Sequence, residues 1–367
     1  MKIINNIATD IPFDYATSLL SNPAEALFLD IETTGFTATS SDLYLIGCAY
    51  FQDNRWYIRQ FFSEDSSHQE EILRAFLDFA KPYRTLIHFN GKTFDLPYLE
   101  KKCRQYNIPW SLSTKETIDL YQIISPYKKL FGISNCKQKT LEQWLGIDRE
   151  DPYNGGELIE IYLEYSSEYD QNAEKTLLLH NQNDMEGMLS LVSLLTYHQF
   201  ISNIPDVTSY RIQTYEDMNG NSGKELILEA TLSQAFPKTV SLNGPGCYLR
   251  LSERKAFLRV PVFSGTLKYF YPNPKEYYYL PTEDRAIHKS VASFVDKDFR
   301  VKATSENCYI RKESTFLPQW SELISPCFRE SSNQTQLYFE FLEESEYDPA
   351  LLSRYFHHVT EYLIHLK

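Results

Sequence analysis

The order of the apolar segments in residues 1–200 is the feature that most restricts the fold. A short apolar run at 26–30 is followed by two β-rich stretches at 43–51 and 56–62, and the later strand patterns alternate with helical ones. Consecutive β-rich stretches form an antiparallel meander, whereas strands that alternate with helices form parallel pairs with helices on both faces. We therefore predict an α/β fold built on a mixed five-stranded sheet flanked by helices.

The remaining segments before residue 200 are helices, apart from two short strands. Apolar residues three and four positions apart indicate helices, and short apolar runs bounded by turn formers indicate strands. On this basis we expect strands at 85–89 and 117–123, and helices at 67–83, 96–106, 138–145, 156–165 and 172–197.

The length of 367 residues indicates two domains, because single hydrophobic cores stop growing at roughly 250 to 300 residues. We expect the α/β domain at 1–200, a linker at 201–223, and a smaller β-rich accessory domain at 224–367 that ends in an amphipathic helix at 348–366. The linker is predicted from the turn-forming residues that gather there, which are Asn203, Pro205, Asn219, Gly220, Asn221 and Gly223.

Hydrophobicity and cysteine content indicate the compartment. No segment comes near the roughly 20 apolar residues that a membrane span requires, and residues 1–20 do not resemble a secretion signal. The six cysteines are scattered and form no Cys-x-x-Cys pair, which argues against a disulfide framework and against a zinc site. We expect a cytoplasmic protein with reduced thiols and no membrane partner.

The charge is distributed unevenly along the chain. The formal net charge of −13 disfavours nucleic-acid binding by itself, because Lys and Arg provide the contacts to phosphate. Residues 1–200 carry 17 basic and 28 acidic residues, whereas 250–312 carries 13 basic and 7 acidic residues. The basic segment is also rich in tyrosine and phenylalanine. These rings either stack nucleic-acid bases or fill the core of a β-sheet.

Four carboxylates stand at informative places in the predicted elements. Asp30 ends the first strand, and Glu32 lies two positions later on the same strand face. Asp95 opens a helix, and Asp184 lies within the last helix. Taken singly, each has an ordinary explanation as a turn, capping or surface carboxylate. Taken together, they occupy the places where α/β sheets carry their sites.

A cluster of carboxylates is unfavourable alone, because like charges raise each other's pKa. Divalent cations remove this repulsion, and oxygen ligands suit Mg²⁺ or Mn²⁺ better than Zn²⁺. Two such ions about 3.5–4 Å apart stabilise both the attacking and the leaving oxygen of a phosphodiester displacement. A metal site of this kind explains why the acidic half of the chain can receive a phosphate.

Three motifs resemble the DnaQ-like 3′→5′ exonucleases of the RNase H-like superfamily, called DEDD after their four acidic residues. The motifs are DIETTG, HFNGKTFDLPYL and HNQND, in this order, within residues 27–195. The segments TIDLY and KTLEQWLGIDREDPYNGGELIEIYLEY are similar more narrowly to the YprB-like branch of predicted exonucleases. The resemblance implies that the four carboxylates bind two Mg²⁺ or Mn²⁺ ions and that nucleoside monophosphates are released from a 3′ end.

The residue expected to activate the attacking water departs from this family. There it is a Tyr four positions before the last Asp or a His five positions before it, whereas here His180 lies four positions before Asp184. Residues four apart share a helix face, so His180 is predicted to face the metal site. An imidazole with a pKa near ~6.5 is a better base than a phenol near ~10. We expect His180 to be the general base.

Residues beside the acidic motifs are expected to hold the substrate. The resemblance places the backbone of Thr33, Thr34 and Gly35 near the 3′-terminal sugar. Asn90 and Lys92 lie on the loop that leads into the second motif, where an amide and an ammonium group can contact the terminal nucleotide and a phosphate. The expected partner is therefore a nucleic acid held at its 3′ end.

The expected activity is metal-dependent 3′→5′ exonuclease hydrolysis of DNA or RNA. One alternative is an RNase H-like endonuclease, and another is a nucleic-acid-binding scaffold without activity. The presence of all four carboxylates argues against the scaffold. The sequence identifies no protein partner and does not distinguish DNA from RNA or single strands from duplexes, because recognition of the 2′-hydroxyl depends on local shape.

Overall fold

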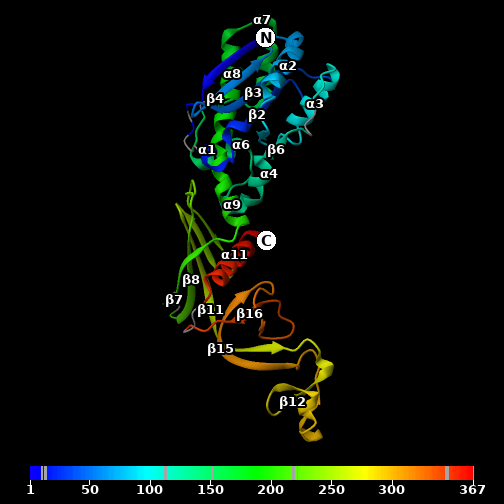
Figure 1. Ribbon diagram of the computed structural model, residues 1–367, viewed down its shortest axis with the longest axis vertical. Helices are drawn as coiled ribbons and strands as arrows, with labels where there is room; N and C mark the ends of the chain where they lie inside the picture. Colours follow the sequence, from blue (N-terminus) through cyan, green and yellow to red (C-terminus); the bar gives the residue numbers. More distant parts are fainter. Residues whose placement is uncertain are drawn as a thin grey trace. The chain divides into compact units, whose positions relative to one another are not determined.

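The structure is a computed structural model in which the chain forms two compact units (Figure 1). It describes residues 1–9, 11, 15–110, 114–149, 152–216, 220, 222–343 and 347–366. The first unit contains 1–199 together with 236–238, and the second contains 200–235 and 239–367.

The first unit is built on a mixed six-stranded sheet in the order β1-β4-β3-β2-β5-β6. The strands β1 to β4 pair antiparallel, whereas β2 with β5 and β5 with β6 pair in parallel. The strands are β1 (Lys2–Ile7), β2 (Ala26–Thr33), β3 (Leu43–Gln52), β4 (Arg55–Phe62), β5 (Thr85–His88) and β6 (Glu116–Asp119). The predicted α/β fold with a mixed sheet is confirmed.

The predicted number of five strands is wrong, because β1 adds a sixth at the edge of the sheet. Its sequence KIINNI alternates between half-buried and exposed side chains and contains two asparagines. Such a strand presents no continuous apolar run, and asparagine is depleted in strands. Because β1 lies at the edge and has a polar composition, the apolar pattern of the sequence did not predict it.

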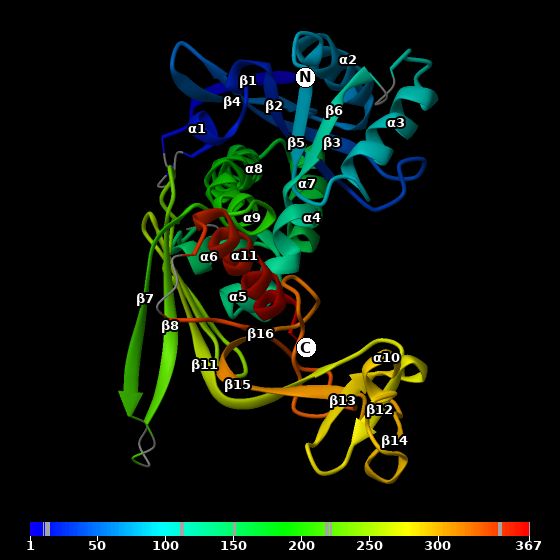
Figure 2. The same ribbon diagram turned by 60° about the horizontal axis from the view of Figure 1, so that its bottom comes forward.

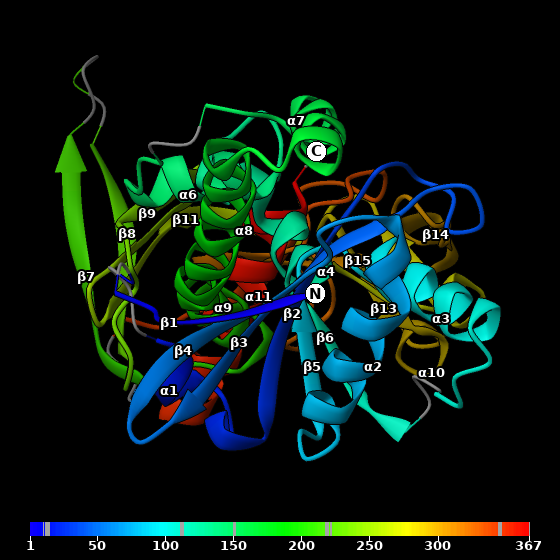
Figure 3. The ribbon, with the colours of Figure 1, turned by 90° about the horizontal axis from the view of Figure 1, so that it is seen from above.

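Helices cover both faces of this sheet (Figure 3). On one face, α2 (Gln69–Ala80) and α3 (Asp95–Gln105) pack against a core that includes Leu27 and Leu29 of β2. On the other face, α7 (Gly155–Glu168) and α8 (Gln171–Leu191) pack against Leu45 and Phe62. The alternation of side chains along β2 consequently directs Asp30 away from the α2 side and toward α8.

The strand expected at 117–123 is confirmed for its first residues and wrong for the rest. Strand β6 ends at Asp119, and helix α4 (Leu120–Ile124) begins there. The Asp119 carboxylate accepts hydrogen bonds from the backbone N–H groups of Tyr121 and Gln122, so it caps the new helix. The apolar run LYQII fits a strand pattern equally well, and the cap decides in favour of the helix.

The other short elements of the first unit connect the sheet to its helices. The helix expected at 172–197 is divided into α8 and α9 (Leu195–Ser202) by a 3₁₀ turn, η5 (Val192–Leu194). The last residues of α9 belong to the second unit. The remaining elements are α1 (Ala16–Leu19), η1 (Pro23–Glu25), η2 (Ser66–His68), η4 (Ser125–Tyr127), α5 (Lys128–Phe131) and α6 (Gln138–Leu145).

The second unit is an antiparallel β structure, which confirms the predicted β-rich region with a C-terminal helix. The long strand β11 pairs with β8 and β10 over its first half and with β15 over its second half. A small three-stranded sheet, in the order β13-β12-β14, lies beside α10 (Figure 2). The elements of this unit include β7 (Val207–Glu216), β8 (Ser222–Thr231), β9 (Val240–Asn243), β10 (Tyr248–Ser252), β11 (Lys255–Phe270), η6 (Pro274–Glu276), β12 (Tyr277–Leu280), β13 (Arg285–His288), α10 (Lys289–Ala292), η7 (Lys297–Phe299), β14 (Val301–Lys302), β15 (Tyr309–Gln319), β16 (Leu337–Glu340) and α11 (Pro349–His365).

The linker expected at 201–223 is a strand over much of its length. Strand β7 occupies Val207–Glu216 and pairs antiparallel with β8. Its sequence VTSYRIQTYE is rich in β-branched and aromatic residues, which favour strands. Nearly all of its side chains are exposed, so no apolar face marked it in the sequence. The turn formers Asn219 and Asn221 lie outside the described residues.

The C-terminal amphipathic helix packs onto the sheet of its own unit as expected. The Tyr355 hydroxyl donates to the carbonyl of Pro318 at 2.9 Å, and Tyr362 stacks on Trp320 with ring centroids 3.9 Å apart. All six cysteines lie in the described part of the chain, and none forms a disulfide. Among the described residues, no helix combines the length and apolarity that crossing a membrane requires.

Candidate metal centre

Asp30 lies at the centre of the sheet of the first unit, directly opposite Gly47 of β3. The side chain of Asn181, from α8, donates its Nδ2–H to Oδ2 of Asp30 at 3.1 Å and accepts from Gln60 Nε2 at 3.0 Å. A Cβ atom at position 47 would lie 2.7 Å from Cγ of Asn181, which is too close for any residue but glycine. Gly47 therefore makes the room in which α8 approaches Asp30.

Asp95 is brought to the same end of β2 by a backbone hydrogen bond. The parallel pairing of β2 with β5 ends at the pair Phe28 and Ile87, so the N–H group of Ile31 has no strand partner in β5. Oδ1 of Asp95 accepts that N–H at 3.2 Å. Asp95 is buried and begins α3, where the helix dipole favours a carboxylate.

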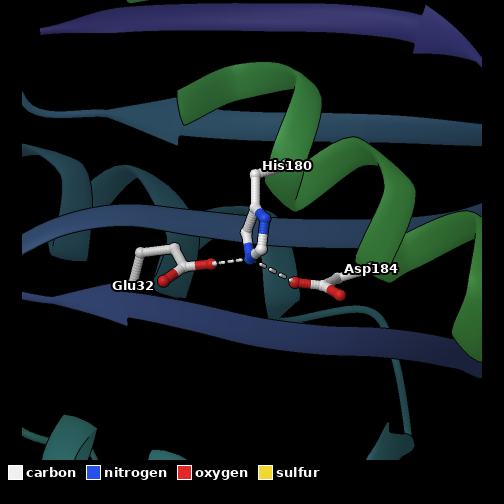
Figure 4. A group of neighbouring side chains, drawn as sticks. All are labelled: Glu32, His180 and Asp184. Carbon is white, nitrogen blue, oxygen red and sulfur yellow. Dashed lines mark ion pairs between the residues drawn. The ribbon is translucent and has the colours of Figure 1, made fainter. Parts of the chain in front are cut away.

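His180 and Asp184 project from one face of α8 toward β2, as their spacing predicted (Figure 4). Nε2 of His180 lies 3.1 Å from Oδ2 of Asp184 and 3.7 Å from Oε1 of Glu32. One possible ligand atom from each of these three residues lies within 4.8 Å of the other two. The N-terminus of α8 is capped by Asp170, which accepts from the N–H groups of Asn172 and Ala173.

The electrostatics of the cluster indicate a shortage of positive charge. Burial raises the pKa of Asp30 well above its usual value, and the charges of Glu32, Asp184 and Asp95 raise it further. Burial also raises the pKa of Glu32 to about 7 and that of Asp95 to about 6. Only the pKa of Asp184 is lowered among these four, because hydrogen bonds and charges from His180 and Arg149 outweigh its burial. Four crowded carboxylate groups are a donor set that fits Mg²⁺ or Mn²⁺.

The hydroxyl groups of Thr33 and Thr34 hold the turn after β2. Thr33 Oγ1 donates to the carbonyl of Gly35 at 2.9 Å, and Thr34 Oγ1 accepts from the N–H of Asp42 at 2.8 Å. Ser41 Oγ also donates to the Gly35 carbonyl, at 3.0 Å. These contacts give both threonines a role in the shape of the loop, and the proposed contact of 33–35 with a sugar remains a prediction.

Asn90 and Lys92 lie on an exposed loop that Asp119 holds in place. The carboxylate of Asp119 accepts from the N–H of Asn90 at 2.9 Å and from the N–H of Lys92 at 3.4 Å. Asn90 adopts a left-handed backbone conformation with φ +60°, which asparagine tolerates better than most residues. The side chains of Asn90 and Lys92 are exposed on this loop, which leads into Asp95.

Two residues beside or within the acidic motifs were not singled out from the sequence. Phe36 follows Gly35 directly, is 92% exposed, and packs its ring edge to face against Phe94 at 5.9 Å. An aromatic residue immediately after the first acidic motif was the available signal. Asn181, within the third motif, was missed because its partner Asp30 is 151 positions away.

A buried arginine was also missed. The guanidinium group of Arg149 forms ion pairs with Asp184 and with Glu142 of α6. Arg149 is the only arginine of the sequence between Arg104 and Arg211, and this isolation within an acidic region was the available signal.

Comparison with known families agrees with this architecture. Residues 27–196, from β2 into α9, match the family model of the RNase H superfamily. This segment is therefore similar to the RNase H superfamily. The matched segment contains β2 to β6, α2 to α8 and the residues of the acidic cluster, and it leaves β1 and almost the whole second unit outside the match.

Several solved structures show low similarity to this chain. A family B DNA polymerase from Pyrobaculum calidifontis matches at 16% identity with a TM-score of 0.38, over 66% of this chain and 33% of the polymerase. The zinc-bound complex of Escherichia coli exonuclease I with single-stranded DNA matches at 12% identity with a TM-score of 0.31, over 62% of this chain and 54% of the exonuclease. The match thus spans between a third and about half of those proteins, and similarity this low assigns no function to this chain. A search among curated proteins found no match.

Proposed function

We propose that this protein is a metal-dependent 3′→5′ exonuclease that hydrolyses phosphodiester bonds of DNA or RNA. The observation that carries the proposal is the convergence of four carboxylates and a histidine at one end of β2, within the segment that matches the RNase H superfamily. Carboxylates crowded in this way are costly to a fold, since burial and mutual repulsion oppose their ionisation. Binding of divalent cations removes that cost.

Each acidic residue has a role in this proposal. Asp30, Glu32, Asp95 and Asp184 hold two Mg²⁺ or Mn²⁺ ions, which supply charge stabilisation to the attacking and leaving oxygens of the phosphodiester. Asn181 orients Asp30 through the bond at 3.1 Å, and the backbone of Ile31 orients Asp95 through the bond at 3.2 Å. These bonds leave the other oxygen of each carboxylate for the metal site.

His180 is the proposed general base. It is buried, and its Nε2 faces the carboxylates of Glu32 and Asp184. A neutral imidazole in this position accepts a proton from the attacking water, and it is a stronger base at neutral pH than the phenol of a tyrosine. The helical spacing of four residues keeps the ring on the same face as Asp184.

The experiment that tests the activity uses DNA and RNA oligonucleotides labelled at the 3′ or the 5′ end, incubated with the full-length protein and Mg²⁺ or Mn²⁺. A 3′→5′ exonuclease releases labelled mononucleotides at once from the 3′-labelled strand and a ladder from the 5′-labelled strand. Internal oligonucleotides as first products would support the endonuclease alternative. Binding of the oligonucleotide without any cleavage would support the inactive scaffold.

Phe36 is predicted to stack on a base of the substrate. Stacking of one base on an aromatic ring contributes roughly 1–3 kcal/mol, so Phe36→Ala should weaken oligonucleotide binding by about 5- to 100-fold with little change in metal binding. Fluorescence anisotropy with a labelled oligonucleotide measures this effect. Leu163→Ala is a matched control, because Leu163 is an apolar residue of α7 that is 53% exposed. Equal binding by the Phe36 variant and the wild type would contradict the stacking role.

The second unit is predicted to supply affinity for longer strands through its basic segment at 250–312. Of the lysines there, Lys268 is unsuitable as a test, because it is half-buried and its ammonium group lies 4.4 Å from the ring centroid of Tyr309. Lys275, Lys289 and Lys302 are exposed. Replacing these three by Glu should weaken binding and reduce the slope of log K against log salt by roughly 2, since each phosphate contact to a single strand contributes about 0.7.

The control replaces three exposed lysines of the first unit by Glu, so that the net charge changes by the same amount. These lysines are Lys81, Lys101 and Lys175. Equal slopes of log K against log salt in the two triple variants would contradict a role of the second unit in binding. Full-length protein is required, because residues 236–238 belong to the first unit and Phe236 stacks on Tyr197 with ring centroids 5.0 Å apart.

A further inference from the structure

A largely buried ion triad joins α6 to the face of α8 that carries His180 and Asp184. Arg149 forms ion pairs through Nη1 with Oδ1 of Asp184 and through Nη2 with Oε1 of Glu142. The side chains of Arg149 and Glu142 are only 8% and 1% exposed. Gln138 of α6 completes the connection, since its Nε2 donates to Oε1 of Glu142 at 3.0 Å and to the main-chain carbonyl of Asp184 at 2.8 Å.

The triad requires a glycine in α8 and leaves two buried polar atoms without hydrogen bonds in the part of the chain that the structure describes, and both features lower stability locally. A Cβ atom at Gly187 of α8 would lie 2.7 Å from Cδ of Glu142 and 2.8 Å from Nη2 of Arg149. Glycine stabilises a helix less than alanine does, so the room that Gly187 leaves for Glu142 and Arg149 lowers the intrinsic stability of α8. In addition, Nε of Arg149 and Oε2 of Glu142 are buried without a hydrogen-bond partner among the described residues. A buried ion pair with unsatisfied atoms is a poor means of stabilising a fold.

We propose that Arg149 is a positioning residue that presents Asp184 to the metal ions. Arg149 holds Oδ1 of Asp184 on the α6 side, which leaves Oδ2 directed toward His180 and Glu32. Glu142 balances the charge of the guanidinium group, so the pair does not repel an approaching cation. This inference rests on the proposed metal site, and it adds residues that the acidic motifs do not contain.

Positioning and simple electrostatics predict opposite effects when the arginine is removed. Loss of a positive charge beside four carboxylates should strengthen cation binding if charge alone matters. Loss of the bond to Oδ1 should weaken cation binding if Arg149 sets the orientation of Asp184, because residues that orient metal ligands typically contribute 10- to 100-fold in affinity. The sign of the change therefore separates the two roles.

The test is isothermal titration of the full-length protein with Mn²⁺, without any substrate. Arg149→Met should bind Mn²⁺ about 10- to 100-fold more weakly than the wild type, and Arg149→Lys should recover part of the affinity because an ammonium group can hold one oxygen but cannot bridge both carboxylates. The control Arg74→Met removes the same charge from an exposed pair with Glu70 and should leave the affinity unchanged.

Two further variants keep the test decisive, because Arg149→Met leaves Glu142 buried without its partner. The double variant Glu142→Leu with Arg149→Met carries no unpaired charge, and Gly187→Ala alters no charge at all. Both should fold, as followed by circular dichroism, and both should bind Mn²⁺ at least about 10-fold more weakly. Mn²⁺ binding as tight as that of the wild type in both variants would overturn the positioning role. Failure of the wild type itself to bind Mn²⁺ would instead overturn the proposed metal site.

Discussion

Asp30→Asn is expected to abolish hydrolysis while leaving the fold intact. The amide has the shape of the carboxylate but lacks its charge, so the site loses a metal ligand without gaining a cavity. Loss of several kcal/mol of stabilisation by the metal corresponds to a rate lower by about 10³-fold or more. Single-turnover release of labelled mononucleotides at saturating Mn²⁺ measures the effect. Activity within a few-fold of the wild type would contradict the assignment of the site.

The same variant is expected to stabilise the metal-free protein at neutral pH. The pKa of Asp30 is raised above its unfolded value near ~3.9, mainly by burial, so its contribution to stability is complete below that pH and is lost as the pH rises through the raised value. Asparagine has no proton to lose. The melting temperature in EDTA should therefore exceed that of the wild type at pH 8, and the difference should shrink toward pH 4.

The matched control for both measurements is Asp78→Asn, which replaces an exposed aspartate of α2 that pairs with Lys81. It should change neither the rate nor the pH dependence of melting by a measurable amount. A melting temperature of metal-free Asp30→Asn below that of the wild type at pH 8 would show that the carboxylate is not strained in the folded protein.

His180→Ala is expected to lower the turnover number by about 10²- to 10⁴-fold, which is the usual contribution of a general base. Binding of Mn²⁺ should change little, since the four carboxylates remain. His180→Tyr should restore part of the rate, because a phenol on the same helix face can still orient water. Turnover is measured from pH 6 to pH 9 under saturating metal and substrate.

The control for this prediction is His198→Ala in α9, where the imidazole contacts the hydroxyl of Tyr127 at 2.8 Å. It should leave the pH profile unchanged. A fully active His180→Ala enzyme across the whole pH range would remove the general-base role and leave the metal site in place.

The positions of the acidic residues of the candidate site could be predicted, because each lies at a place that local patterns reveal. Asp30 ends a buried strand, Asp95 begins a helix, and Asp184 repeats the helix face of His180. Their neighbours could not be predicted in the same way. The role of Arg149 depends on how α6 docks against α8, and that of Asn181 depends on the missing side chain of Gly47 in β3.

The elements of the fold follow the same division. The buried strands β2 and β3 and the amphipathic helices α2 and α11 carry apolar patterns that their burial requires. Strands β1 and β7 are largely exposed, so their residues are not selected for an apolar face and resemble loops in the sequence. Burial, and not secondary structure as such, is what a single sequence reveals most readily.

The hydrogen bond between Asn181 and Asp30 joins residues 151 positions apart, and this separation determines how late in synthesis the candidate site is completed. A chain emerging from a ribosome completes β2 early but receives α8 only near the end of the domain. Until then, Asp30 and Glu32 lack Asp184 and His180, so the proposed metal centre is incomplete. Fraying of α8 in the finished protein would likewise separate His180 and Asp184 from β2 before the sheet unfolds, so the proposed hydrolysis would report on the integrity of this helix.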